Sequence, residues 1–175
     1  MRDLIETLDE DGPLRLKTTL PLEKATTIIT AARRLARDAD LLPQTVVDQD
    51  AGGKLIAAES EDGSGILRFD IALGKAWGAL GMGISSRQIR DRLAKRPSFQ
   101  GALAAASDGR VVPVPGGVLI EDAEGDTIGA VGISGDTSEK DEYCAVAGIR
   151  AAGLVPNPPE PGPNWQGSSL SDTDK

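Results

Sequence analysis

The chain has 175 residues with 19 basic and 27 acidic side chains, a formal net charge of −8. This length supports one domain around a single hydrophobic core and leaves no room for two large domains. Histidine is absent and Cys144 is the single cysteine, which excludes catalysis by Ser-His-Asp or Cys-His sets, His-ligated zinc or haem, and an intramolecular disulfide. The acidic charge also argues against nucleic acid or an anionic membrane as the main partner, since both repel a net anion.

Residues 1–19 form an acidic segment that we interpret as an N-terminal extension. The segment lacks the basic region and apolar run of a secretory signal. No later stretch reaches the roughly 18 consecutive apolar residues that a membrane span requires. We therefore expect a cytoplasmic protein with no membrane partner.

The first half of the chain predicts a helix, a hairpin and a second helix. Apolar residues repeat at helical spacing over residues 21–38, and a proline occupies the first turn. Two β-rich runs, Thr45–Asp50 and Lys54–Glu59, flank a glycine-containing turn and so indicate a hairpin. Helical spacing then returns over Ile66–Met82.

The second half predicts mostly strands. A capping box, Ser85–Gln88, opens a short helix, and Pro97 starts another. The expected later elements are strands at Val111–Val114, Val118–Ile120 and Thr127–Ile133, and a helix from Asp136 to about Gly153. Because strands and helices do not alternate as βαβ units, the order predicts an α+β domain with a five-stranded antiparallel sheet flanked by helices.

Residues 155–175 differ in composition from the preceding chain, because they hold five of the eleven prolines. We interpret them as a Pro-rich C-terminal tail. Such a segment is typical of a disordered linker or of a tail that wraps a partner. In the second case Trp165 and Leu170 are candidate anchors on a neighbouring subunit.

Several motifs in residues 20–154 together resemble the GlcG/HbpS-like family of haem-binding and glycolate-utilisation accessory proteins. The matching segments are Leu20–Ala25, Val46–Leu55, Asp62–Gly63, Asp70–Ala76, Pro115–Ile120, Gly129–Gly135 and Asp141–Gly148. The resemblance implies a profilin-like domain over residues 20–154, assembly into homodimers or larger rings, and a pocket for a small ligand. It also implies haem or another tetrapyrrole as that ligand.

The chain departs from the family pattern at two points that concern the ligand. Many relatives carry an Arg-Met pair where this chain has Ser60 and Glu61, so an anionic ligand there loses its cationic partner. Without histidine, an axial ligand to haem iron is restricted to a few side chains. The candidates are Tyr143, Cys144, Met82, Lys75 or a hydroxyl group.

Lys75 is the principal candidate for a functional side chain. It lies within a helix of small apolar residues, and three alanines share its face at helical spacing. An amine drawn into such a stripe could bind an anion, form a Schiff base or act as a base. The alternatives are that Lys75 extends to solvent or pairs with Asp70 or Asp48.

Two functions follow from these candidates. The first is a ligand-binding accessory protein, and the second is a small enzyme or enzyme subunit in the catabolism of a hydroxy acid, an aldehyde or a related metabolite. The catalytic candidates are Lys75 as base or anion anchor and Asp50 and Asp141 as carboxylates, with backbone N–H groups near Gly116 and Gly117 as an oxyanion site. The ligand-binding candidates are Lys75, Gly116, Gly117 and Ser134. No metal site is predicted.

Small residues predict close packing in two places. Gly129, Gly132 and Gly135 interrupt one expected strand, which indicates a helix packed tightly on the sheet rather than a phosphate loop. Cys144 lies in a stripe of small residues and is expected to be a packed, inert thiol. A local excess of positive charge over residues 87–96 could hold an acidic tail of another subunit or a ligand carboxylate, or simply face solvent.

Overall fold

The computed structural model describes residues 12–14 and 16–170. Most of the proposed N-terminal extension and the last five residues of the proposed tail therefore lie outside the described residues. Among the helices that are described, none combines the length and the apolar character needed to cross a membrane.

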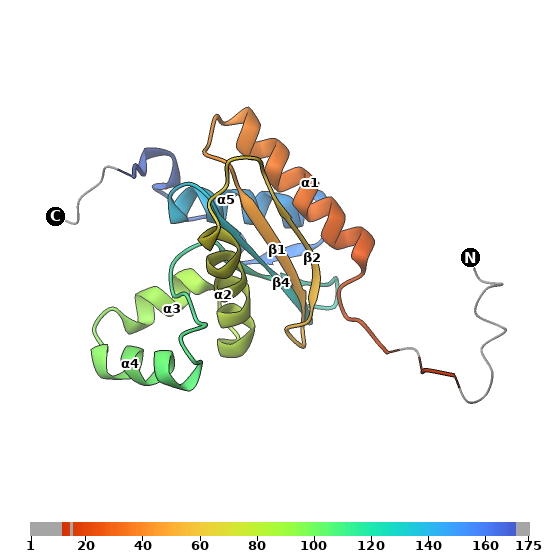
Figure 1. Cartoon of the computed structure of the whole chain (residues 1–175), viewed down its shortest axis with the longest axis horizontal. Helices are drawn as coiled ribbons and strands as arrows, with labels where there is room; N and C mark the ends of the chain where they lie inside the picture. The colour runs from red at the N-terminus through yellow and green to blue at the C-terminus, as the bar shows by residue number, and fades with distance from the viewer. Residues whose placement is uncertain (1–11, 15, 171–175) are drawn as a thin grey trace.

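The described chain forms an α+β domain around one five-stranded sheet (Figure 1), and all of its neighbouring strands are antiparallel, as predicted. The strand order is β2-β1-β4-β3-β5. The strands are β1 (Thr45–Asp50), β2 (Leu55–Ser60), β3 (Gly117–Glu121), β4 (Thr127–Ser134) and β5 (Val155–Asn157). The helices are α1 (Leu22–Asp38), α2 (Leu67–Met82), α3 (Ser86–Leu93), α4 (Pro97–Ala106), α5 (Ser138–Ala151) and the 3-10 helix η1 (Trp165–Gly167).

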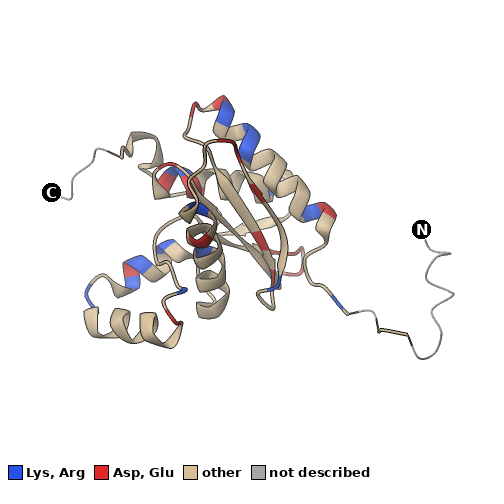
Figure 2. Cartoon of the chain, in the orientation of Figure 1, with Lys and Arg blue, Asp and Glu red and all other residues tan. Residues whose placement is uncertain are grey.

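The helices cover the two faces of the sheet unequally. Helices α1 and α5 pack side by side on one face, α2 covers the other, and α3 and α4 extend beyond α2 (Figure 1). The layer under α1 and α5 is a broad aliphatic core that includes Ile28, Val131 and Ile149. The layer under α2 is thinner and is built largely from alanines and glycines. Figure 2 shows that α4 carries no charged side chain, unlike α3.

Glycines in the sheet let α2 lie directly on the strands. A Cβ atom on Gly132 in β4 would stand 1.9 Å from the carbonyl oxygen of Ala72, and one on Gly117 in β3 would stand 2.3 Å from that of Lys75. Both distances are far below van der Waals contact, so only glycine fits at either position. The tight helix-on-sheet packing predicted from the glycines is therefore confirmed at Gly132.

The expected strand at Val111–Val114 is wrong, because this segment is irregular and lies against α2 instead of joining the sheet. The backbone N–H of Val112 donates to the carbonyl oxygen of Gly74 at 3.3 Å, and the side chain of Val111 packs against Gly78. The place beside β3 is taken by β5, whose residues fall at the start of the Pro-rich tail.

The Pro-rich tail folds back on its own chain over the residues that the structure describes. Its first residues pair with β3 as strand β5. Trp165 then stacks on Tyr143 of α5, with ring centroids 3.8 Å apart and planes inclined by 6°. Trp165 is thus anchored on its own chain, while Leu170 is 61% exposed. The contact of either residue with a neighbouring subunit stays a prediction.

The basic helix α3 helps to hold the tail in place. The guanidinium of Arg87 donates to the buried carboxylate of Glu142 at 2.9 Å and to the carbonyl oxygen of Glu160 at 3.1 Å. Glu142 also accepts a hydrogen bond from the backbone N–H of Gly162 at 2.8 Å. Arg87 therefore binds a tail, but through a backbone carbonyl of the same chain.

We expect Gly132→Ala to lower the free energy of unfolding by about 3 kcal/mol, because the new methyl group would push α2 off the sheet. Urea unfolding followed by circular dichroism measures the change. The matched control is Gly101→Ala in α4, where the added Cβ meets open space and the helix should gain up to about 1 kcal/mol. Equal effects at both positions would contradict the proposed close contact.

Candidate functional site

A fully buried ion pair links α2 to α5. The ammonium nitrogen of Lys75 lies 2.8 Å from Oδ2 of Asp141, and each side chain is 1% exposed. Lys75 also donates to the carbonyl oxygen of Ile133 at 2.8 Å. The three alanines predicted to share the face of Lys75 are buried with it, so the stripe is confirmed.

The ion pair crosses from one face of the sheet to the other, since α2 and α5 lie on opposite faces (Figure 1). The crossing point is Gly116, just before β3, which has φ +116°. A Cβ atom there would stand 2.9 Å from the Lys75 nitrogen and 3.1 Å from the Asp141 side chain. Glycine is needed at this position for both its conformation and its lack of a side chain.

The second carboxylate oxygen of Asp141 accepts a hydrogen bond from the backbone N–H of Asp136 at 3.1 Å. Burial raises the pKa of Asp141 above its ordinary value, and the charge and hydrogen bond of Lys75 oppose that rise. We infer that the pair is ionised, because the ammonium group stands within hydrogen-bonding distance of the carboxylate.

The structure brings together only some of the candidate residues. Lys75, Asp141 and Gly116 meet, but the N–H of Gly117 is already bound to the hydroxyl of Ser86 at 2.8 Å. The Ser134 hydroxyl accepts from Arg68 at 3.2 Å.

Asp50 is separate from this group. Its carboxylate accepts from the N–H groups of Gly52 and Lys54, both at 3.0 Å, and so closes the β1–β2 turn. The predicted pairing of Lys75 with Asp70 or Asp48 is wrong, because its partner is Asp141.

Asp48 in β1 is a second buried carboxyl group, and it lacks a partner. It is fully buried beside Val131 and Ala57 of the neighbouring strands. Neither carboxylate oxygen has a hydrogen-bond partner among the residues described. Burial alone raises the pKa of Asp48 well above its ordinary value, so the folded protein favours the neutral acid.

A cavity of about 540 Å³ lies on the side of α2 that faces away from the Lys75 stripe. Its walls combine a helical stripe of α2 with the β1–β2 hairpin and the loop at residues 108–112. The principal lining side chains are Gln49, Leu55, Phe69, Leu73, Trp77 and Arg110. Phe69 and Trp77 are two of the five aromatic residues in the whole sequence, so an aromatic-poor chain concentrates two of them here.

Two polar side chains, Gln49 and Arg110, line this cavity. Gln49 is 2% exposed, and its amide nitrogen donates to the carbonyl oxygen of Gly53 at 2.8 Å. Its amide oxygen is buried and has no hydrogen-bond partner within the described structure. At the rim, the guanidinium of Arg110 lies 4.1 Å from the ring centroid of Trp77. It also donates to the carbonyl oxygen of Ser107.

The residues around this cavity fit the organic part of a tetrapyrrole but not its iron. Apolar and aromatic walls suit a macrocycle. Arg110 suits a carboxylate, whereas Asp70 and Asp108, which line the same cavity, repel one. The side chains considered for axial ligation do not line the cavity. Lys75 is held in its ion pair, Tyr143 stacks on Trp165, and burial raises the pKa of the Cys144 thiol to about 12. Cys144 is thus the packed thiol that the sequence predicted.

The cavity residues Gln49 and Arg110 were not candidates in the sequence analysis. The available signal was the scarcity of aromatic residues, because it draws attention to Phe69 and Trp77, which lie a little over two turns apart on one helix. The contribution of Arg110 depends on a loop that crosses α2 at Gly74, and a single sequence does not reveal that contact.

The antiparallel sheet with helices on both faces is the profilin-like α+β fold that the resemblance implied. The family model described as "Haem degrading protein HbpS-like" matches residues 20–150. The chain therefore belongs to the HbpS-like family.

Three relatives illustrate the match. An uncharacterised 15.0 kDa protein of the dhaT-dhaS intergenic region of Citrobacter freundii is 29% identical over 127 residues, which is 69% of this chain and 88% of that protein. The crystal structure of a PduOC complex with heme superimposes with a TM-score of 0.70 at 26% identity, covering 77% of this chain and 96% of that one. A double mutant of Streptomyces reticuli HbpS gives a TM-score of 0.66 at 26% identity, covering 82% and 94%.

Breaking the buried ion pair should be costly. We expect Lys75→Met to lower the free energy of unfolding by about 3–5 kcal/mol, because it leaves Asp141 charged, buried and unpaired. The control is Lys140→Met, which removes a more exposed (i, i+4) pair with Asp136 and should cost under about 1 kcal/mol. Chemical denaturation measures both, and similar losses would contradict the buried, ionised pair.

The unpaired carboxyl of Asp48 predicts a pH dependence. Because its pKa is raised in the folded state, it favours folding below the ordinary aspartate pKa of about 4, and this contribution is lost as pH rises through the raised value. Asp48→Val should therefore gain about 1–3 kcal/mol over the parent at pH 8 and much less at pH 4. Urea titrations at both pH values test this. The exposed-site control Asp38→Ala should show no such difference, and a pH-independent gain for Asp48→Val would exclude a raised pKa.

Proposed function

We propose that this protein is a small-molecule-binding accessory protein and that the cavity beside Trp77 is its ligand site. The observation that carries the proposal is the combination of two aromatic side chains, an exposed guanidinium and the unpartnered buried amide oxygen of Gln49 in one cavity. Its volume falls within the range of about 300–1,000 Å³ that is usual for small-ligand sites.

The side chains define the class of ligand. A flat apolar face would pack on Trp77 and Phe69, a carboxylate would bind Arg110, and an N–H or O–H group would donate to Gln49. Haem and other tetrapyrroles belong to this class, and the family membership and the PduOC complex with heme support them. The cavity lining would hold such a molecule through its ring and its carboxylates.

The alternative function, an enzyme of small-metabolite catabolism, has less support from the geometry. Lys75 and Asp141 satisfy each other in a buried pair, and Asp50 belongs to a turn. Their predicted catalytic roles, like the ligand-binding roles of Gly116, Gly117 and Ser134, stay predictions. The cytoplasmic location and the homo-oligomeric state belong to the same proposal.

Titration with haemin and with metal-free protoporphyrin tests the ligand site. In a Trp165→Phe background Trp77 is the only indole, so a bound porphyrin should quench its fluorescence in a saturable manner and shift the Soret band. Since a charge-assisted hydrogen bond contributes about 1.5–3 kcal/mol, Arg110→Ala should weaken binding at least about tenfold.

The control is Arg92→Ala on α3, which removes a surface guanidinium away from the cavity. It should leave the affinity unchanged. Failure of both porphyrins to bind would remove the tetrapyrrole class, and equal affinities of the Arg110→Ala and Arg92→Ala proteins would place the site elsewhere.

A further inference from the structure

The charged side chains that line the cavity beside Trp77 do not balance one another. Asp70 and Asp108 contribute two carboxylates, whereas Arg110 contributes one guanidinium. Both aspartates are exposed, and neither has an ion-pair partner within the described part of the chain. The lining of the cavity therefore carries a net negative charge, which attracts cations and repels a second anion.

The two carboxylates come from separate elements. Asp70, Leu73 and Trp77 stand at positions i, i+3 and i+7 of α2, which places them on one stripe of the helix, and all three line the cavity. Asp108 reaches the same cavity from the loop after α4, where its backbone has φ +50°. A ligand that packs on Trp77 thus meets a carboxylate of the helix and a carboxylate of the loop.

The other polar groups of the cavity do not offset this excess of acceptors. The amide nitrogen of Gln49 is bound to Gly53, so the remaining polar atom of Gln49 is an acceptor oxygen. The guanidinium of Arg110 lies 4.1 Å from the ring centroid of Trp77, which shows that the indole already attracts a planar cation of its own chain. Arg110 can pair in a bidentate manner with one ligand carboxylate, and a second carboxylate has no cation to meet.

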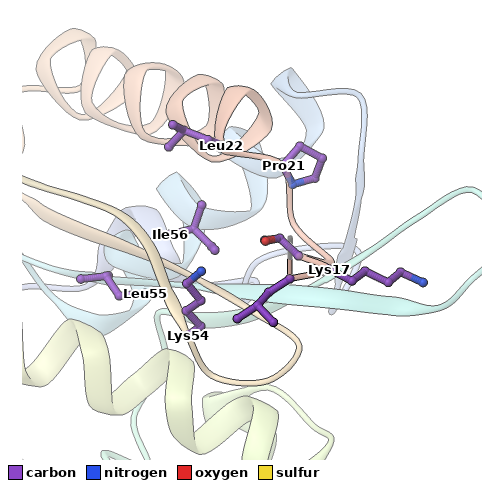
Figure 3. A pocket seen from close by; sticks show the side chains of 8 residues that line it. Lys17, Pro21, Leu22, Lys54, Leu55 and Ile56 are labelled. Carbon is purple, nitrogen blue, oxygen red and sulfur yellow. The ribbon is translucent and has the colours of Figure 1, made fainter. Parts of the chain in front are cut away.

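A second hollow, of about 760 Å³, has the opposite charge. It lies between the start of α1 and β2, and the charged side chains among the described residues that line it are Lys17 and Lys54. Figure 3 shows Lys54 next to Leu55, with Leu22 of α1 above them. Although the whole chain has a net charge of −8, its hollows are not uniformly acidic. The negative lining beside Trp77 is therefore a local feature.

We propose that Asp70 and Asp108 determine the specificity of the ligand site. They select a planar ligand whose polar substituents are cationic or N–H donors over a ligand with two carboxylates. A ligand ammonium group finds an acceptor on either aspartate, whereas a second carboxylate is repelled. This inference rests on the proposed function, since it takes the cavity beside Trp77 as the ligand site, and it narrows the class of ligand. A tetrapyrrole whose carboxylates are converted to amides should bind more tightly than one whose carboxylates are free.

Two porphyrins that differ in charge test this selection. One is metal-free protoporphyrin, which carries two carboxylates, and the other is its bis(aminoethyl amide), which carries two ammonium groups instead. In the Trp165→Phe background at low ionic strength, quenching of Trp77 should show tighter binding of the amide derivative. Asp70→Asn and Asp108→Asn should each weaken the binding of the amide derivative and tighten that of protoporphyrin, by about threefold. Asparagine also tolerates the positive φ of residue 108.

Opposite effects on the two porphyrins identify electrostatic selection, because a folding defect would weaken both. The matched control is Asp38→Asn on the exposed side of α1, which removes the same charge on the opposite face of the sheet and should change neither affinity. Changes in the same direction, or an unchanged ratio of the two affinities in the Asp70→Asn, Asp108→Asn double variant, would overturn the inference while the ligand site stands. Quenching by neither porphyrin would remove the ligand site itself, and this inference with it.

Discussion

The buried pair of Lys75 and Asp141 is the interaction on which the packing of helices on both faces of the sheet depends. The two residues belong to helices on opposite faces of the sheet, and their charges meet beside Gly116 without access to water. Two isolated charges in this position would each be strongly unfavourable, whereas together they satisfy one another. The pair consequently fixes how α2 is rotated about its axis, because only one rotation directs Lys75 to Gly116.

That rotation determines which side chains of α2 face the sheet and which face the cavity. With Lys75 and the alanine stripe directed inward, the stripe that holds Trp77 faces outward. Glycines at positions 117 and 132 bring the helix close to the sheet, while Gly74 and Gly78 admit the loop that supplies Arg110. Lys75, the principal candidate in the sequence, thus holds α2 in place through its ion pair. The proposed ligand cavity lies on the opposite side of the same helix.

Much of the fold was predictable because its elements are encoded locally. The periodicity of residues 21–38, the turn before Lys54 and the capping box at Ser85 specify α1, the hairpin and α3 within a few residues. The errors concern choices between distant partners. Val111–Val114 has the composition of a strand. It packs on α2 instead, because Gly74 and Gly78, more than thirty positions earlier, leave room for it there. The stripe of small residues around Lys75 was likewise predictable from the sequence. Its ion-pair partner, Asp141, was not, because it lies 66 positions away.

The strand order has a consequence for how the protein is made. The edge of β3 that faces away from β4 is covered by β5, which is separated from β3 by the β4 strand and all of α5. During synthesis, β1 through β4 can assemble while this apolar, unpaired edge still waits for residues 155–157. Unpaired edges in partly folded chains are where aggregation starts. Once β5 pairs with β3, this edge is covered. The start of the Pro-rich segment therefore ends the period in which the exposed edge of β3 can pair with another nascent chain.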